Sequence, residues 1–474
     1  MSVESSSHSK AIPIDDVRDV VGRLLPRYRA TLEELARIES VSWPSFDASQ
    51  VQRSAEFVAE AASALEIFEG GVAIVRARIG ESGELGQPAV IARREPKNGA
   101  PTVLLYAHHD VQPPGDSLGW ETPPFVPTLK GERLYGRGVA DDKAGVISHL
   151  AALEALFEVD PETPLGVVLF IEGEEEYGSP SFGNLLKDQR NRLESDVIIV
   201  ADSGNWTTEI PALTVSLRGN ATLRVNVRTL DHALHSGMFG GVVPDAMMAL
   251  VQILSRLHQA DGSIAVPGLV SSSAPVPAYT EQTLRDESGL LTGVSPIGRG
   301  DFLDRIWNQP SITVIGLDAP ATHASSNTLL PEASAMVSLR VAPGQDAQSA
   351  ADVLATFLTQ DAPWGAQVDV EIMGTGSAFK MDPTNDVVDL IKESMKAAWN
   401  VAPVDIGVGG SIPFIADFVE EFPGAVVLVT GIEDPGTRAH SPNESLHLPT
   451  FERAIVTQAH FLLEMGARAE HPAG

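Results

Sequence analysis

The chain has 474 residues, 43% of them hydrophobic, and no cysteine, so disulfides, thiolate metal ligands and cysteine nucleophiles are excluded. Its 33 Lys and Arg against 63 Asp and Glu give a formal net charge of -30, which repels nucleic acid and anionic membranes. The N-terminus is polar and no apolar run approaches the roughly 18 to 20 residues of a membrane helix. We therefore expect a cytoplasmic protein that binds neither nucleic acid nor membrane, and its length favours two domains.

The first part of the chain predicts alternating helices and strands. A helical pattern covers residues 17–40, where Pro26 is expected to break or kink the helix. Short apolar runs follow at 102–110, 165–173 and 195–203, with an amphipathic helical pattern over 144–158 between the first two. Runs that are apolar on both faces are typical of buried parallel strands, and ligands of such sheets gather where the strands end.

The pattern changes near residue 212, where apolar and polar residues alternate as in antiparallel strands. Residues 259–310, rich in Gly, Ser and Pro, predict loops with short helices. The first pattern returns near residue 378. We therefore predict an α/β fold in which a mostly parallel-sheet domain, 1–211 and 378–474, carries an inserted α+β domain over 212–377.

Polar residues follow the predicted strands, and each alone has an ordinary explanation as a helix cap or a solvated side chain. The residues at these strand ends and adjoining turns are His108, His109, Asp110, Asp141, Asp142, Glu174, Glu175, Glu176, Asp202 and His440. Together, so many carboxylates at one sheet edge would repel each other unless cations neutralised them. Histidine and carboxylate ligands without cysteine suit Zn, Mn or Co, so the sequence predicts a metal site.

The two adjacent histidines are distinguished by strand periodicity. Residues i and i+2 of a strand share a face, so His108 and Asp110 are expected to point into one site and His109 away from it.

Seven features occur in order along the chain: "YAHHDVQPP", "LYGRGVADDKAG", "EGEEEYGS", the strand end at Asp202, "HSGMFGG", "GGSIP" and "AHSPNES". In that order they resemble the dinuclear metallopeptidase family that includes cytosolic nonspecific dipeptidase and carnosinase, aminoacylase, glutamate carboxypeptidase, acetylornithine deacetylase and succinyl-diaminopimelate desuccinylase. The resemblance implies a catalytic domain of the zinc-exopeptidase type and a lid and dimerisation role for the inserted domain.

The same resemblance implies two divalent ions per subunit, with Zn as first choice and Mn or Co as alternatives. Asp141 would bridge the ions. One ion would also take His108 and Asp202, and the other Glu176 and His440. Asp110 would orient His108. Glu175 would act as general base toward a water between the ions and pass its proton to the leaving amine.

The inserted domain is expected to form a homodimer in which His235, from "HSGMFGG", stabilises the oxyanion in the partner subunit's site. The resemblance implies substrate contacts from Asn327, from Arg340, which would grip a carboxylate, and from a glycine loop, Gly409, Gly410 and Ser411. A phosphate-binding role for that loop is disfavoured because the lysine of a P-loop is missing.

Asp202 favours the dipeptidase branch, because carboxypeptidase and deacylase members of the family carry glutamate at that position. Hydrolysis of dipeptides is our first hypothesis. An N-acyl amino acid amidohydrolase (deacylase) or a carboxypeptidase of the same family is the alternative. A catalytically silent binding or scaffold relative is disfavoured because all five ligand positions and Glu175 are filled, and a serine hydrolase because no G-x-S-x-G occurs.

Overall fold

The computed structural model describes residues 13–410 and 413–470, which divide into two compact units. The larger unit takes its residues from 13–214, 381–405 and 417–470. The smaller takes them from 215–380, 406–410 and 413–416. The short segment after residue 405, which includes Gly409 and Gly410, thus groups with the smaller unit. The predicted α/β class is confirmed: a mostly parallel sheet with helices lies in the larger unit and a separate antiparallel sheet in the smaller.

The central sheet of the larger unit is parallel through its middle. Its strands run in the order β1-β2-β6-β3-β7-β17-β8, and two short strands, β15 (Phe379–Lys380) and β16 (Val404–Val408), both pair with β8. Their bounds are β1 Val72–Val75, β2 Ala89–Arg94, β3 Thr102–His108, β6 Gly166–Glu172, β7 Val197–Val200, β8 Ala212–Leu217 and β17 Val426–Val429. The pairs β6–β3, β3–β7 and β7–β17 are parallel, with His108 opposite Glu172 and Tyr106 opposite Val200. The carboxyl ends of β3, β6 and β7 therefore lie at one edge of the sheet.

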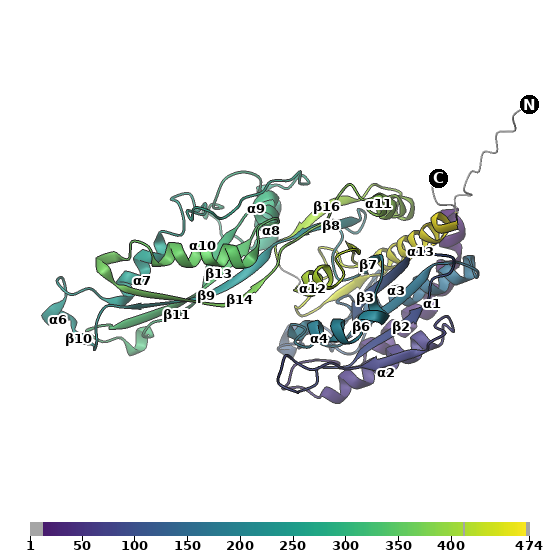
Figure 1. Cartoon of the computed structure of the whole chain (residues 1–474), viewed down its shortest axis with the longest axis horizontal. Helices are drawn as coiled ribbons and strands as arrows, with labels where there is room; N and C mark the ends of the chain where they lie inside the picture. The colour runs from purple at the N-terminus through teal and green to yellow at the C-terminus, as the bar shows by residue number, and fades with distance from the viewer. Residues whose placement is uncertain (1–12, 411–412, 471–474) are drawn as a thin grey trace, which may run out of the picture. The chain divides into compact units, whose positions relative to one another are not determined.

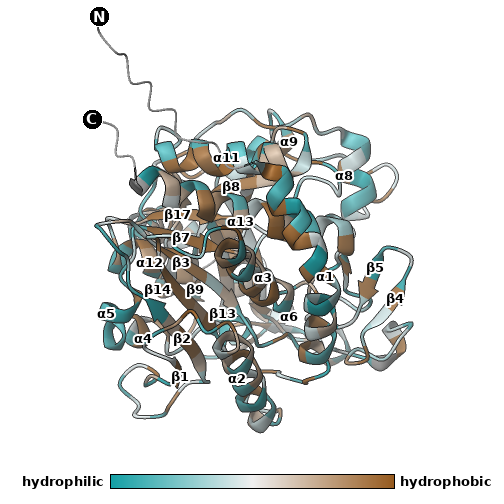
Figure 2. Ribbon diagram, turned by 90° about the vertical axis from the view of Figure 1, so that its right-hand side faces the viewer, coloured by the Kyte–Doolittle hydropathy of each residue, from teal (hydrophilic) through white to brown (hydrophobic). Residues whose placement is uncertain are grey.

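Burial explains why these three segments form central strands. Every residue of β3, β6 and β7 is buried, as runs that are apolar on both faces require. Figure 1 shows the three strands side by side, and in Figure 2 β3 and β7 are coloured as hydrophobic.

An aromatic cluster packs on the side chains of β3 and β6. The Tyr106 ring meets Phe170, Phe182 and Phe418 edge-on, with centroids 5.4 to 6.1 Å apart. Its hydroxyl donates to Glu172 Oε2 at 2.5 Å. This contact ties the ends of the two strands together just before the polar residues that follow them.

Helices surround this sheet. Their bounds are α1 Ile14–Ala36, α2 Ala48–Ser63, α3 Lys143–Val159, α4 Phe182–Asp188, α5 Arg190–Leu193, α11 Asp386–Trp399, α12 Pro413–Glu421, which continues from the smaller unit into the larger, and α13 Leu448–Glu470. The helix α3 packs on β3 and also on α1 and α13. It is buried along nearly its whole length, so the predicted amphipathic helix is wrong in that respect. No helix within residues 13–410 and 413–470 is both long and apolar enough to cross a membrane.

The expected break at Pro26 is absent, because α1 continues through it. Pro26 and Gly22, the residue whose carbonyl would accept its missing hydrogen bond, both lie on the exposed side of the helix, where water can replace that bond. Val17, Val21 and Leu32 on the other side are fully buried.

The smaller unit has a four-stranded antiparallel sheet in the order β11-β13-β9-β14, on which α7 and α10 pack. The bounds are β9 Gly219–Arg228, β11 Ser311–Asp318, β13 Glu332–Val341, β14 Gln367–Gly376, α7 Ala246–Ser255 and α10 Ala347–Thr359. Strict alternation of buried and accessible residues along β13 accounts for a sheet covered by helices on one face. The predicted loops with short helices are confirmed as α8 Glu281–Ser288 and α9 Phe302–Asn308.

Shorter elements complete both units. They are β4 Thr128–Lys130, β5 Arg133–Tyr135 and β18 Ser445–His447 in one small sheet, β10 Leu234–His235 and β12 Thr328–Leu329 in a ribbon, α6 Ser236–Phe239, β15 Phe379–Lys380 and β16 Val404–Val408. Figure 1 shows β10 and α6 at the end of the smaller unit that lies far from α9.

His149 makes the core of the larger unit sensitive to acid. Its ring nitrogens lie 2.9 Å from Tyr106 O and Gln458 Oε1, and burial lowers the pKa of His149 to about 4. Because the unfolded pKa is about 6.5, the unfolded chain binds the extra proton, and stability falls as pH drops from 6.5 toward 4. We expect this group to contribute roughly 2 kcal/mol to the loss between about pH 7.5 and pH 4.5.

The variant His149→Gln, which can still donate to Tyr106 O, should lose less stability over that interval than the wild type. Urea unfolding of both proteins at the two pH values measures the difference. Equal losses would contradict the role given to His149.

Candidate metal centre

The carboxyl ends of β3, β6 and β7 bring together polar residues that are far apart in sequence. His108 is the last residue of β3, the short helix Glu175–Tyr177 follows β6, and Asp202 comes two residues after β7. Asp141 lies in the loop before α3, and His440 lies in the loop after β17. All of these side chains belong to the larger unit.

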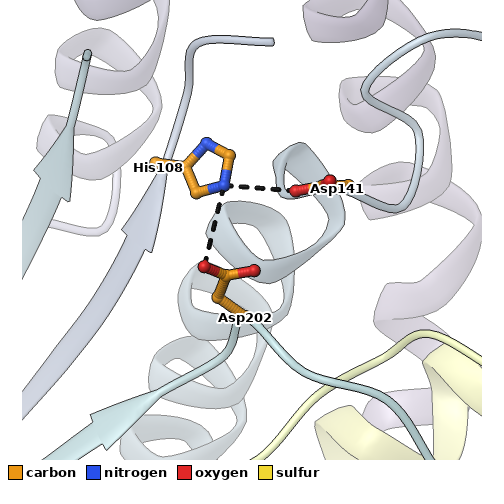
Figure 3. A group of neighbouring side chains, drawn as sticks. All are labelled: His108, Asp141 and Asp202. Carbon is orange, nitrogen blue, oxygen red and sulfur yellow. Dashed lines mark ion pairs between the residues drawn. The ribbon is translucent and has the colours of Figure 1, made fainter. Parts of the chain in front are cut away.

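Two clusters of ligand-type side chains share Asp141. His108, Asp141 and Asp202 form one, and Asp141, Glu176 and His440 form the other, each with its ligand atoms within 4.8 Å of one another. Asp141 Oδ1 lies 3.2 Å from His108 Nε2, and Asp141 Oδ2 lies 2.9 Å from His440 Nε2. Each oxygen of this carboxylate therefore faces a different cluster. Figure 3 shows the first cluster, with one ring nitrogen of His108 directed at both carboxylates.

The spacing of these atoms fits divalent ions. His440 Nε2 lies 3.1 Å from Glu176 Oε2, and His108 Nε2 lies 4.0 Å from Asp202 Oδ2. Ligand atoms about 2.0–2.2 Å from a tetrahedral zinc ion would be about 3.3–3.6 Å apart, within the range that these pairs span. His108 Nε2 is buried and makes no well-formed hydrogen bond with any described residue, as expected of a nitrogen meant to bind an ion.

The electrostatics also favour added positive charge. Burial raises the pKa of Glu176 to about 7 and that of Asp202 to about 6, and nearby Asp141 adds to both shifts. Burial, together with Asp202 and Glu176, raises the pKa of Glu175 well above its usual range against the opposing effect of His108. Hydrogen bonds to Asp141 and Glu176 raise the pKa of His440 to about 11. In the ion-free chain protons balance this acidic cluster, and bound cations would displace them.

Asp110 connects a candidate ligand to the turn that carries the Glu pair. Its backbone O and its Oδ1 lie 3.2 and 3.4 Å from His108 Nδ1, on the ring side opposite Asp141. The same carboxylate accepts the backbone N–H groups of Glu175 at 3.2 Å and Glu176 at 3.1 Å. Asp110 thus sets the orientation of one imidazole and the position of the Glu175–Glu176 backbone.

His109 lies in the core, away from both clusters. Its Nε2 is 2.9 Å from Pro88 O, and burial lowers the pKa of His109 to about 4.

Gln112 is a contact that the sequence did not single out. Its backbone N–H donates to Glu176 Oε1 at 3.1 Å and its side-chain amide to Glu176 Oε2 at 2.8 Å. The only local signal was its place in "DVQPP", two residues after Asp110. These bonds hold the Glu176 carboxylate in a fixed orientation next to His440.

In the smaller unit, His235 and Asn327 come together. His235 pairs with Thr328 across the β10–β12 ribbon, and Ser236 N–H donates to Asn327 O at 2.9 Å. The exposed His235 ring accepts the Gly237 N–H at Nδ1, 3.0 Å away, so the proton of the neutral ring resides on Nε2. That Nε2–H is a donor available to a ligand.

Arg340 lies elsewhere in the smaller unit. It is half-buried near the end of β13, opposite Ser311 and Asn220. The stretch of β13 from Glu332 to Arg340 spans about 26 Å at roughly 3.3 Å per residue.

The glycine loop is held by Arg218. The Arg218 Nε donates to Gly409 O at 2.9 Å, and Gly410 follows in a bend. Ser411 lies outside the described residues.

A parallel sheet whose carboxyl edge carries two histidine–carboxylate clusters with a common aspartate is the arrangement of a metal-dependent hydrolase. The chain belongs to peptidase family M20/M25/M40, whose model matches residues 104–464. It is 35% identical over 382 residues to the cysteinylglycine-S-conjugate dipeptidase of Corynebacterium striatum, covering 80% of this chain and 84% of that protein. It is 28% identical to the human Beta-Ala-His dipeptidase, covering 80% of this chain and 77% of the relative.

A solved structure shows the same fold. The di-peptidase Dug1p of Saccharomyces cerevisiae superimposes with a TM-score of 0.73 at 25% identity, covering 97% of this chain and 99% of that one. These three relatives are described as dipeptidases, and each match covers most of this chain and includes residues of both units.

Proposed function

We propose that the protein hydrolyses the peptide bond of dipeptides with two divalent ions per subunit. The observation that carries this proposal is the Asp141 carboxylate, whose two oxygens face two separate ligand clusters. His108 and Asp202 would complete the site of one ion, and Glu176 and His440 that of the other. The relatives described as dipeptidases support a dipeptide as the substrate.

The ions, when bound, supply positive charge that acidifies water and polarises the peptide carbonyl. Glu175 is placed to move the proton. It is half-buried, its Oε2 lies 3.8 Å from His108 Nε2, and its backbone is fixed by Asp110. Burial, which raises the pKa of Glu175, suits a carboxylate that accepts a proton from the attacking water and delivers it to the leaving amine.

Substrate recognition falls to the smaller unit. The Arg340 guanidinium can hold a dipeptide carboxylate through two parallel hydrogen bonds. Gly409, Gly410 and Ser411, of which Ser411 lies outside the described residues, remain the other predicted substrate contacts. The Nε2–H of His235 can donate to the oxyanion that forms as the carbonyl is attacked, with Asn327 beside it.

The distance between these groups supports a homodimer. His235 and Asn327 lie beyond the start of β13, while Arg340 lies near its end, and a dipeptide is far shorter than the roughly 26 Å of strand between them. One chain therefore cannot place both groups on one substrate. We assign His235 and Asn327 to the active site of the partner subunit. Arg340 then acts in a site that receives the corresponding histidine and asparagine from the other chain.

The choice of metal is inferred from the types of ligand. Imidazole and carboxylate ligands fit Zn first, with Mn and Co as alternatives. The cysteine-free composition is consistent with the expected cytoplasmic location.

The function is tested by a substrate screen on the purified protein reconstituted with Zn, Mn or Co. We expect cleavage of dipeptides with free amino and carboxyl ends, and weak or no release of amino acids from N-acetyl or N-carbamoyl derivatives. Faster cleavage of the N-acyl compounds would favour the amidohydrolase alternative, and faster trimming of longer peptides the carboxypeptidase. No cleavage of any class with any ion would refute the proposal.

Mixing two inactive variants tests the shared site. Equal amounts of His235→Ala and Glu175→Gln chains, exchanged into mixed dimers, should recover roughly a quarter of the wild-type activity, because half of the dimers are mixed and each has one complete site. A mixture of His235→Ala and Asn327→Ala is the control. His235 and Asn327 both belong to the pair that one chain provides to its partner's site. Every site therefore lacks one member of that pair, and activity should not rise above the average of the two parents. Recovery in neither mixture would contradict the exchange of His235.

A further inference from the structure

Glu444 and Arg137 form a fully buried ion pair outside the two ligand clusters. Arg137 Nη1 lies 2.6 Å from Glu444 Oε2, and both side chains are at most 1% exposed. A buried ion pair is weak evidence for stability, because desolvation offsets most of the attraction between the charges. The same Glu444 carboxylate also makes hydrogen bonds with other groups.

Three backbone amides of the Asp141 loop point at Glu444. Its Oε2 accepts the N–H of Gly138 at 3.0 Å, and its Oε1 accepts those of Ala140 and Asp141, each at 3.1 Å. With Arg137, each carboxylate oxygen receives two hydrogen bonds, which is its full capacity. The main chain that presents Asp141 is therefore fixed by one side chain from a segment about 300 residues later.

The same residue ends the loop that carries His440. Glu444 follows His440 by four residues, and its carbonyl accepts the Gly136 N–H at 3.0 Å. Just beyond it, β18 pairs with β5. Glu444 thus joins the loop of Asp141 to the loop of His440 through its side chain and its backbone.

We propose that Glu444, with Arg137, is a positioning residue that sets Asp141 and His440 in register for the ion shared by Asp141, Glu176 and His440. This inference rests on the ligand assignment of the proposed function. The other cluster shares Asp141 but depends less on Glu444, because its two other members are placed by strands, His108 at the end of β3 and Asp202 two residues after β7. Loss of Glu444 should therefore weaken one ion site more than the other.

Metal titration of Glu444→Gln tests the inference. The metal-free wild type, titrated with Zn²⁺ against a competing chelator, should bind two ions per chain. The variant should keep one ion with affinity within about threefold and bind the second about 10–100-fold more weakly, the range typical of a lost outer-shell partner. Hydrogen exchange of the metal-free variant should speed up in peptides covering 136–142 and 438–444 together.

A second variant covers the case in which Glu444→Gln fails to fold. Glu444→Asp keeps the charge for Arg137 but is one methylene too short to reach the guanidinium and the amides at once. It should give the same unequal loss of the two ions.

Asp434→Asn is the matched control. Asp434 is also buried and lies in the same loop as His440. Arg133 Nη1 donates to its Oδ1 at 3.1 Å and Arg133 Nη2 to its Oδ2 at 2.9 Å, but Asp434 receives no hydrogen bond from the Asp141 loop. It should lower thermal stability and leave both affinities within about threefold.

Equal weakening of both ions by Glu444→Gln, no weakening, or the same unequal loss in Asp434→Asn would each overturn the positioning role. A wild type that binds two ions but cleaves no dipeptide would refute the proposed function and leave the positioning role standing on the titration. A wild type that cannot bind a second ion would overturn the ligand assignment and the positioning role together.

Discussion

Replacing Glu175 with glutamine should lower kcat for dipeptide hydrolysis by about 10²–10⁴-fold, the usual contribution of a positioned general base. The amide keeps the size and backbone contacts of the residue, including the N–H donated to Asp110, but cannot take a proton from water. Because Glu175 belongs to neither ligand cluster, the variant should still bind two ions and unfold at nearly the wild-type temperature. Steady-state kinetics, metal analysis and a thermal scan of the same preparation measure these three quantities.

The control for this variant is Glu39→Gln, which removes the same charge from an exposed position. It should change kcat by less than about twofold, because a solvated surface carboxylate is screened from the site. If Glu175→Gln kept full activity, another group would be the base. If it lost activity together with an ion, Glu175 would be a ligand instead.

The strand ends were predictable because two local patterns agree there. A continuous apolar run identifies β3 as a buried parallel strand, and its period of two separates His108 from His109. The structure shows the two rings in different surroundings, His108 against Asp141 and His109 against Pro88 O. The same reasoning brings the Glu pair after β6 and Asp202 after β7 to one edge.

Contacts between distant segments left no such pattern. Gln112 and Glu444 act on Glu176 and on the Asp141 loop through hydrogen bonds formed only when the chain has folded, so no periodicity marks them. At Pro26 a local rule failed for a different reason. A proline costs about 3 kcal/mol inside a helix, but here the lost bond faces water while the buried side of α1 packs on α3 and α13.

The assignment of the glycine loop shows a similar limit. Sequence order places residues 406–410 after the inserted domain, whereas in the structure they group with it. Arg218 accounts for this, because its backbone N–H donates to Val408 O at 3.2 Å and its side chain to Gly409 O at 2.9 Å. A single arginine 191 residues earlier gives no signal that a sequence pattern could reveal.

Replacing Asp141 with asparagine should weaken both ions at once, because both clusters contain this residue and each of its oxygens faces a different histidine. Asparagine keeps one oxygen, turns the other position into a donor and removes the negative charge. We expect each affinity to fall by more than the roughly 100-fold upper range for outer-shell changes, and dipeptide hydrolysis to be lost with it. Chelator-competition titration and metal analysis measure the two affinities.

Three variants make this expectation specific to a shared ligand. Asp202→Asn and Glu176→Gln should each weaken one ion, since each residue belongs to one cluster. Asp142→Asn should leave both ion affinities within a few-fold of the wild type. The side-chain oxygen of the asparagine can still accept the backbone N–H of His108, which donates to Asp142 Oδ2 at 3.2 Å in the wild type. If Asp141→Asn removed only one ion, as Asp202→Asn should, the carboxylate would be a ligand of a single ion. The two clusters would then have to be filled independently, and a water held between two ions could not be the nucleophile that Glu175 activates.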